Sequence, residues 1–424
     1  MFGTDQSVAR TNTRRRAVLR AGAITVVSGL AGCMQPLLEG EDEEVSTNNS
    51  DTSSNEGATE EDGSEEEDDP IELTERWETE IRGSVIALGD EKIFVGNNDE
   101  LVALSFENGE RSWRTLQSES ESRFGVTNDP RTGIQYDDLY ILGFDNQLES
   151  ASLYQVDTDD GEIENSYYID GSTGGLIPNS DELILDTQRE RDHEIEEGNA
   201  THYCNYGGGE FITLSPELEE LSRIDKPNEL CRSRSSAAGG GSIIIEDNPF
   251  VYSIDESDGS VHWRKDFALR DDPIVTDDAV FLPTLNEGLK RINIVSGEEV
   301  WTFDDYNYGE RSASVAKSDR AVYACQFALH SLDPADGEVN WTTVLPEEPL
   351  EHDNAVRTAD GVVWILTGEY LLAYDEDDGE KLLEKTIDAE WDRLWVRDST
   401  IVLHDDGSRE ETGLTVYDID SMAN

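Results

Sequence analysis

A short phrase that recurs along the chain constrains the fold more than any other feature of the sequence. Its clearest copy is LHSLDPADGEVNW, from Leu329 to Trp341. It reads as an apolar strand, a tight polar turn with a glycine, and a second strand closed by tryptophan. Further copies begin at Leu101, Val251, Leu289 and Leu371, and one without the tryptophan begins at Leu153. Repetition of this kind is typical of folds built from one small supersecondary unit.

Two degenerate copies complete the set. One begins at Phe211 and lacks the glycine, and the other begins at Leu414, near the end of the chain. The eight copies lie about forty residues apart in most cases, and another β-rich run precedes nearly every copy. Each period therefore holds about four short strands, and no helical periodicity occurs at this spacing. The sequence predicts an all-β, eight-bladed β-propeller over residues 71–424.

The two ends of this region complement each other. The copy at Leu414 ends before it reaches a turn glycine or a tryptophan strand, whereas an unpartnered tryptophan strand around Trp77 opens the region. We expect the N-terminal strand to complete the blade that the C-terminal strand begins. Such closure would leave no open edge strand in the ring.

Two residue types recur within the blades, and each has a structural reason. The glycines stand where a hairpin turn needs a positive φ angle; they are Gly109, Gly161, Gly259, Gly297, Gly337 and Gly379. The tryptophans are large enough to wedge against a neighbouring blade and to contribute a few kcal/mol each; they are Trp77, Trp113, Trp263, Trp301 and Trp341. We expect these residues to dock each blade on the next.

The pattern Ala-x-Asp-x-x-x-Gly-x-x-x-Trp is similar to the tryptophan-docking repeat of PQQ-binding-like propellers. The first copy reads Ala103, Ser105, Gly109 and Trp113, and the resemblance extends over nearly everything after Ile71. Three copies depart from it, with Asn165, Arg223 and Leu383 at the tryptophan position. The family includes quinoprotein alcohol dehydrogenases and non-catalytic lipoproteins of outer-membrane assembly. The resemblance implies an eight-bladed ring and leaves both kinds of function to be weighed.

The N-terminus resembles an export signal. Arg14 and Arg15 begin a twin-arginine pattern, and a short apolar run from Ala21 to Ala31 follows. That run is too short for a permanent membrane-spanning helix. It ends in a lipobox-like sequence at Cys33, so residues 1–33 are expected to be a signal peptide that ends at a lipidated cysteine. The mature protein would be anchored by lipid at the outer face of the cell membrane.

The charge and composition of the chain predict the environment in which the protein works. The stretch from Glu39 to Asp69 is almost entirely acidic or small and polar, which predicts that residues 34–70 are a disordered tether. The whole chain has 95 acidic and 32 basic residues, for a formal net charge of -63. Such a surface repels nucleic acid and anionic lipids. The acid-rich, lysine-poor composition resembles that of proteins from extreme halophiles, in which molar salt screens the repulsion.

The candidate chemical sites in the sequence have simpler explanations. Quinoprotein dehydrogenases resemble one another in a vicinal cysteine pair, a calcium site and an aspartate base, but the cysteines of this chain are not adjacent in sequence. The acidic turn around Asp375 to Gly379 lacks the spacing of an EF-hand, so turn chemistry explains it. The sequence therefore predicts no catalytic residue and no metal site, and neither PQQ nor calcium as a cofactor.

The richest departure from the repeats is the segment from Gln188 to Gly209. His193, His202 and Cys204 lie within it, but their spacing matches no closed zinc site. Cys204 is a candidate disulfide partner of Cys231, which would leave Cys325 as a buried thiol. Three glycosylation sequons begin at Asn48, Asn199 and Asn340. Long loops on rigid scaffolds are frequent recognition sites, so this segment is the first candidate for a binding surface.

The predicted function is a lipid-anchored, non-catalytic scaffold that presents its faces to an envelope protein. One alternative is an enzyme similar to the PQQ-dependent dehydrogenases, with a divergent site. A second is a sensing propeller that holds a small ligand in its central channel.

Overall fold

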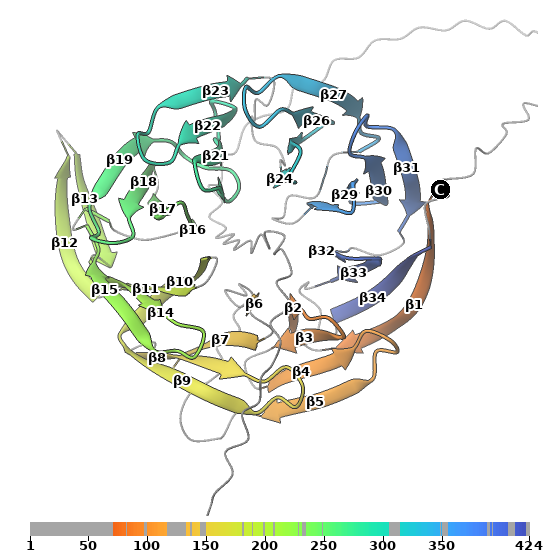
Figure 1. The fold of residues 1–424 in the computed structure, drawn as a ribbon, viewed down its shortest axis with the longest axis horizontal. Helices are drawn as coiled ribbons and strands as arrows, with labels where there is room; N and C mark the ends of the chain where they lie inside the picture. The colour runs from red at the N-terminus through yellow and green to blue at the C-terminus, as the bar shows by residue number, and fades with distance from the viewer. Residues whose placement is uncertain are drawn as a thin grey trace, which may run out of the picture.

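The computed structural model describes residues 71–420, except for gaps at 82, 97–99, 117–132, 136–137, 145–149, 180–181, 189, 198–199, 207, 228, 231–234, 248, 305–313, 348, 350–354, 388–390, 392 and 406–411. The described chain forms eight four-stranded antiparallel sheets and one separate two-stranded hairpin. The sheets are arranged as blades around a central axis (Figure 1). The predicted all-β, eight-bladed propeller is confirmed.

The first four blades follow one another along the chain, and within each blade the fourth strand lies at the rim (Figure 1). Blade 1 holds β2 (Ser84–Leu88), β3 (Lys92–Gly96), β4 (Glu100–Ser105) and β5 (Arg111–Leu116). Blade 2 holds β6 (Gly133–Gln135), β7 (Asp138–Phe144), β8 (Ser150–Val156) and β9 (Ile163–Asp170). Blade 3 holds β10 (Ser172–Asn179), β11 (Glu182–Gln188), β14 (Glu210–Leu214) and β15 (Glu220–Asp225). Blade 4 holds β16 (Ser235–Gly239), β17 (Ser242–Asp247), β18 (Phe250–Asp255) and β19 (Val261–Asp266).

The remaining blades complete the ring. Blade 5 holds β20 (Ile274–Val275), β21 (Ala279–Pro283), β22 (Leu289–Asn293) and β23 (Glu299–Phe303). Blade 6 holds β24 (Ser314–Lys317), β25 (Val322–Cys325), β26 (Ala328–Leu332) and β27 (Val339–Val344). Blade 7 holds β28 (Val356–Ala359), β29 (Val362–Leu366), β30 (Tyr370–Asp375) and β31 (Lys381–Thr386). Blade 8 holds β32 (Arg393–Arg397), β33 (Thr400–His404), β34 (Thr412–Asp420) and β1 (Glu72–Ile81).

The ring is closed by strands from opposite ends of the chain, as the sequence predicts. Strand β1 pairs antiparallel with β34, and Trp77 lies opposite Val416. Arg76 forms an ion pair with Asp418 across this junction and donates a hydrogen bond of 2.9 Å to the Phe106 carbonyl of blade 1. The closing strand is therefore bonded both within blade 8 and to the next blade.

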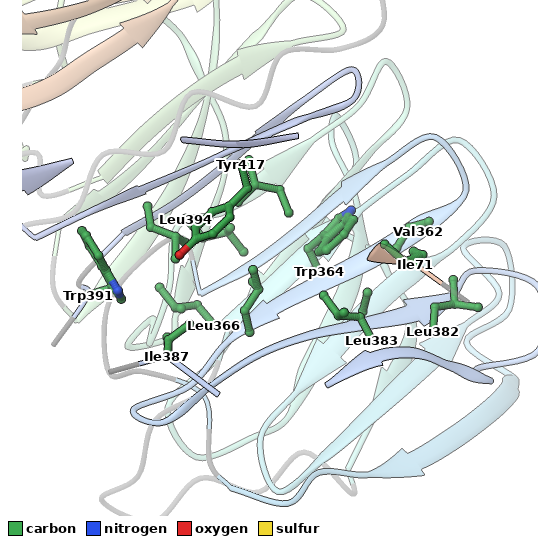
Figure 2. Packing of buried hydrophobic residues seen from close by; sticks show 14 residues of the cluster. Ile71, Val362, Trp364, Leu366, Leu382, Leu383, Ile387, Trp391, Leu394 and Tyr417 are labelled. Atoms are coloured by element: carbon green, nitrogen blue, oxygen red, sulfur yellow. The ribbon is translucent and has the colours of Figure 1, made fainter. Parts of the chain in front are cut away.

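The core consists of apolar clusters between adjacent blades. The second and third strands supply most of it because both of their faces are covered. Figure 2 shows the cluster between blades 7 and 8, in which Trp364 and Leu383 lie near Ile71 from the start of the described chain. Each fully buried side chain of this size stabilises the fold by about 2 kcal/mol. Blade-to-blade packing is thus the main source of stability.

An aromatic pair recurs inside three blades. A ring on the second strand contacts the tryptophan of the fourth strand, and the two ring centroids lie 5.7 Å apart for Phe94 and Trp113 and 5.8 Å apart for Phe281 and Trp301. The third pair, Tyr323 and Trp341, has a centroid distance of 6.0 Å. These tilted contacts fix each tryptophan in the orientation from which it reaches the next blade.

Within the part of the chain that the structure describes, no helix has the length and apolar character needed to cross a membrane.

Candidate binding surface on blade 3

Tryptophans dock five blades on their neighbours in the same way. The indole N–H of each donates to the carbonyl three residues before the turn glycine of the next blade, over 2.8–3.1 Å. A Cβ atom added to any of these five glycines would lie only 2.5–2.8 Å from an indole carbon. The tryptophans are Trp77, Trp113, Trp263, Trp301 and Trp341, and they dock on Gly109, Gly161, Gly297, Gly337 and Gly379 respectively. Glycine is required there because a side chain would displace the ring.

Blade 7 departs from this pattern because of the ring closure. Leu383 replaces the tryptophan and lies opposite Ala373. The next blade has no hairpin turn on which a tryptophan could dock, because its third and fourth strands come from the two ends of the chain. Ile71 packs at this junction instead, and its N–H bonds to the Leu382 carbonyl at 3.3 Å.

Blade 2 departs because the turn that follows it is different. Asn165 stands in the tryptophan position and donates to Gln155 at 2.6 Å, which in turn donates to Asp138 at 2.7 Å. The turn of blade 3 lacks glycine, and Leu218 adopts the positive φ of 61° there. The side chain of Tyr167, two residues beyond Asn165, packs against the cluster that contains Leu218.

Blade 3 departs most, and its register corrects one assignment made from the sequence. Its turn is one residue shorter than the others, so Ser222 and not Arg223 takes the tryptophan position. Ser222 lies opposite Thr213 and donates to its hydroxyl at 3.0 Å, whereas Arg223 lies opposite Ile212. Gly259 of blade 4 is covered by the Asp225 carbonyl, which would be 2.7 Å from an added Cβ. No indole fills this junction.

A groove of ≈ 690 Å³ lies beside Ser222, at the junction of blades 3 and 4. Its walls are the beginning of β15, the turn between β16 and β17, and the turn between β18 and β19. The lining residues are Glu182, Thr213, Leu221, Ser222, Gly240, Gly241, Asp255, Glu256, Ser257, His262 and Val295. The sequence does not predict this groove. The absent tryptophan and the short turn were visible signals, but only the register brings the acidic residues of blades 3 and 4 together.

The groove is acidic, and its carboxylates differ in environment. Burial raises the pKa of Glu256, and the nearby charge of Glu182 raises it further. Asn179 donates to Glu256 at 2.9 Å, which opposes that effect. Hydrogen bonds from Ser257 lower the pKa of Asp255, and the His262 ring nitrogen lies 3.6 Å from this carboxylate. Negative charge is therefore concentrated where one carboxylate is poorly solvated.

The inserted segment of blade 3 forms a hairpin of β12 (Glu190–Glu197) and β13 (Ala200–Tyr206). Figure 1 shows this hairpin at the outer edge of the ring. His193 lies opposite Cys204 in its backbone register, and His202 lies opposite Ile195. The hairpin follows the C-terminal end of β11, whereas Glu182 and the groove lie at the N-terminal end of that strand. Blade 3 therefore carries two irregular features, one at each end of the same strand.

A buried ion pair braces the base of the hairpin. Lys226 bonds to Asp186, and their side chains are only 3% and 0% exposed. The Lys226 ammonium also lies 5.0 Å from the centroid of the Phe211 ring. Thr187 exchanges two hydrogen bonds of 2.9 Å with the backbone of Glu210. These buried contacts hold the base of the hairpin in place.

A charged cluster lies across the fourth strand of blade 2 and the third and fourth strands of blade 3. Arg223 bonds to Glu220 and Glu210 over 2.7–3.0 Å, and Tyr167 donates to Glu220 at 2.5 Å. The bonds from Arg223 and Tyr167 lower the pKa of Glu220 to about 2. Burial and the bond to Glu220 raise the pKa of Tyr167 to about 12. The cluster joins the two blades where the docking tryptophan is missing.

Several residues predicted from the sequence fall outside the described chain. They are Arg14, Arg15, Cys33 and Cys231, so the export signal, the lipidation site and the pairing of Cys204 remain predictions. Cys325 is a free thiol that is completely buried between blades 6 and 7. Among the residues that the structure describes, no group of three His, Cys, Asp or Glu side chains is arranged to hold a metal ion.

The chain is similar to proteins of one family and one fold. Residues 219–422 match the family model described as outer membrane protein assembly factor BamB. BamB from Moraxella catarrhalis is 13% identical, with a TM-score of 0.51, over 82% of this chain and 99% of that chain. The computationally designed Ika8 protein is 11% identical, with a TM-score of 0.56, over 80% of this chain and 98% of that chain.

A quinohaemoprotein alcohol dehydrogenase from Pseudomonas putida is 11% identical, with a TM-score of 0.52, over 83% of this chain and 77% of that chain. No curated protein sequence matches the chain significantly. At these identities the solved structures establish the fold alone. The propeller therefore shares its fold with BamB and with a quinoprotein dehydrogenase, and its second half, residues 219–422, matches the BamB family.

Proposed function

We propose that the protein is a non-catalytic scaffold, anchored by lipid at the outer face of the cell membrane, that binds an envelope protein. The observation that carries this proposal is the match of residues 219–422 to the family described as an outer membrane protein assembly factor. The assembly role belongs to that family, and a scaffold function for this chain is inferred from the likeness. The partner of this chain would be a protein exposed on the same side of the membrane.

Blade 3 is the proposed recognition surface. The other blades repeat a common plan, in which packing requirements account for most of the residues. Blade 3 adds a hairpin at one end of β11 and a groove at the other, and neither is needed to close the ring. Departures from a regular scaffold are where recognition concentrates. The buried pair Asp186 and Lys226 would hold the hairpin steady, which lowers the entropic cost of binding.

The proposed location depends on the N-terminal residues. Arg14 and Arg15 would direct export, and Cys33 would carry the lipid, with residues 34–70 as a tether between the membrane and the propeller. A Cys33→Ser variant should be exported and released from membranes, whereas replacement of both arginines by lysine should block export. Fractionation of cells with detection of a C-terminal tag measures both outcomes.

The scaffold function is tested by crosslinking the tagged protein in its own membranes at native salt, followed by purification. One envelope protein recovered in near-stoichiometric yield would support the proposal. A variant with residues 190–206 replaced by a short Gly-Ser loop tests the hairpin, and it should lose that partner while keeping its melting temperature. Empty crosslinks with the wild-type protein would contradict the scaffold function.

The alternative is an enzyme similar to quinoprotein dehydrogenases, since one of them has the same fold. The described residues do not fit that chemistry. Cys325 is buried in the apolar cluster between blades 6 and 7, without an adjacent cysteine, and no described group of three acidic, His or Cys residues could hold calcium. We therefore propose that the protein works without a quinone. Absorbance of the protein after addition of PQQ and calcium tests this proposal, and a stable bound-quinone spectrum would contradict it.

A further inference from the structure

The glycosylation sequon at Asn340 lies in strand β27 of blade 6. The other two sequons, at Asn48 and Asn199, lie outside the described residues. In such a motif the asparagine amide accepts a sugar, and the residue two positions later is a serine or a threonine, here Thr342. A strand covered on both sides would hide these side chains. The place of β27 in its blade therefore decides whether the folded protein can carry a sugar here.

Strand β27 is the outer strand of blade 6 (Figure 1). Within the described chain it pairs with β26 alone, so its other edge is open. The pairing register skips Asn340, which lies at a β-bulge between Val339 and Trp341. Asn340 and Thr342 are both exposed, whereas Trp341 between them docks on Gly379 of blade 7. Both functional side chains of the sequon therefore lie at the surface.

The hydrogen bonds of Asn340 are compatible with a sugar on its amide. Its Nδ2 atom donates to the Ser331 hydroxyl over 3.3 Å, which is longer than most N–H···O hydrogen bonds. A side-chain amide nitrogen has two hydrogens. One of them can keep the bond to Ser331 while a sugar replaces the other. Modification would therefore cost the strand none of the contacts that hold it in the blade.

Strand β27 also lacks the protection that the other outer strands have. In the described ring, each of the seven other outer strands contains at least one charged residue. Charges on an open edge discourage its pairing with another molecule. Strand β27 reads VNWTTV and has none, and its Val339 and Val344 are 47% and 79% exposed. An open, uncharged and partly apolar edge of this kind invites association unless something covers it.

We propose that Asn340 carries an N-linked glycan that covers the open edge of β27. A glycan is bulky and well hydrated, so it would protect this edge as charged residues protect the others. Two independent features coincide here, namely a sequon with both functional side chains exposed and an outer strand without charge. The proposal rests on the proposed location outside the cell membrane, where a glycosyltransferase would meet the protein, and it goes beyond the scaffold function.

The modification is a glycosyl transfer from a donor whose sugar is joined through its anomeric carbon to a phosphate. The bond between that carbon and the phosphate oxygen breaks, and its electron pair leaves with the phosphate. A bond forms between the anomeric carbon and Nδ2 of Asn340, which gives up one proton to a base of the transferase. The remaining Nδ2 hydrogen stays available to Ser331. The envelope of the cell supplies both the donor and the transferase.

Mass spectrometry of the exported wild-type protein, purified from its own cells by a C-terminal tag, tests the modification. The tryptic peptide of residues 321–357 contains Asn340 and no other sequon. We expect this peptide to be heavier by the mass of a glycan, with the addition on Asn340. Thr342→Val should abolish the addition, whereas Thr342→Ser, which keeps the hydroxyl, should retain it. A bare Asn340 in the exported protein would overturn the proposal.

Sedimentation at native salt tests whether the glycan covers the edge. Asn340→Gln removes the sugar and leaves the edge uncharged, so it should associate more than the wild type as the protein concentration rises. Adding Val344→Lys places a charge on that edge and should restore the wild-type behaviour. Ser112→Gln is the matched control, because Ser112 is at the same bulge of the charged strand β5. Wild-type sedimentation of Asn340→Gln would contradict the covering role.

Replacement of Arg14 and Arg15 by lysine separates this proposal from the proposed location. A glycan on the wild-type protein and a bare Asn340 in that export-blocked variant would support both. An exported wild-type protein with a bare Asn340 would overturn the glycan alone. A wild-type protein that stays inside the cell with a bare Asn340 would overturn both. A glycosylated protein that captures no partner on crosslinking would support the glycan and contradict the scaffold function.

Discussion

Trp77 in strand β1 lies opposite Val416 in strand β34, and its indole N–H donates to the Phe106 carbonyl of blade 1 at 2.9 Å. One side chain thus joins both ends of the chain to the following blade. We expect Trp77→Ala to lower the free energy of unfolding by about 3 kcal/mol, because a large ring and its hydrogen bond are lost together.

Urea denaturation followed by circular dichroism measures this effect. Trp77→Phe is the control, since it keeps most of the packing and should cost only about 1 kcal/mol. A Trp77→Ala protein as stable as the wild type would show that the Trp77 ring does not stabilise the closure of the propeller.

Two turn glycines allow the cost of a clash between an added side chain and a tryptophan to be measured separately from the cost of backbone strain. Gly379 and Gly361 have φ angles of 74° and 81°, so alanine is strained at both. A Cβ at Gly379 would lie 2.5 Å from Trp341, whereas nothing lies within 4 Å of a Cβ at Gly361. We expect Gly361→Ala to cost about 1–2 kcal/mol and Gly379→Ala distinctly more. Thermal denaturation of the two variants measures the difference, and equal losses would contradict the docking role of Gly379.

The sequence was sufficient for the ring and insufficient for the groove. The eight copies of the repeat and the complementary ends around Trp77 and Leu414 predict the blade number and the closure, because strand alternation and turn glycines are local signals. The groove depends on the turn of blade 3, which is one residue shorter than the other turns. The repeat in the sequence therefore places Arg223 at the tryptophan position, which Ser222 occupies in the structure. Its acidic residues come from separate blades, and their proximity is set by tertiary packing.

The buried pair at the base of the hairpin should be costly to break. Lys226→Met leaves the Asp186 carboxylate in a site where its side chain is 0% exposed, so we expect a loss of about 3–5 kcal/mol. Lys381→Met is the control, because Lys381 pairs with Glu384 at the surface and such pairs contribute less than about 1 kcal/mol. Adding Asp186→Asn to Lys226→Met should recover part of the loss in denaturant titrations. Similar losses for the Lys226 and Lys381 variants would contradict the role of the buried pair.

The cluster between blades 2 and 3 predicts a measurable titration. The pKa of Glu220 is lowered from 4.5 to about 2, first by its bonds to Arg223 and then by the bond from Tyr167. Ionised Glu220 therefore stabilises the folded state above pH 4.5, and this contribution is lost as the pH falls through about 2. Carboxyl carbon NMR should place its midpoint near 2 and show a rise in Arg223→Met. A midpoint that does not move in the variant would show that Arg223 is not the cause.

Cys325 predicts a protected thiol at the interface of blades 6 and 7. It is fully buried in a cluster with Leu329, Val363 and Tyr374, and burial raises the pKa of its thiol. Because the thiolate is the reactive form, iodoacetamide should label Cys325 in urea and not in the native protein. Peptide mapping by mass spectrometry reads this residue separately from the other cysteines. Cys325→Ala should cost little, whereas Cys325→Ser should cost about 1–3 kcal/mol, because it buries a hydroxyl among apolar side chains. Rapid labelling of the native protein would mean that blades 6 and 7 separate in solution, and the docking of Trp341 on blade 7 would then not hold that interface closed.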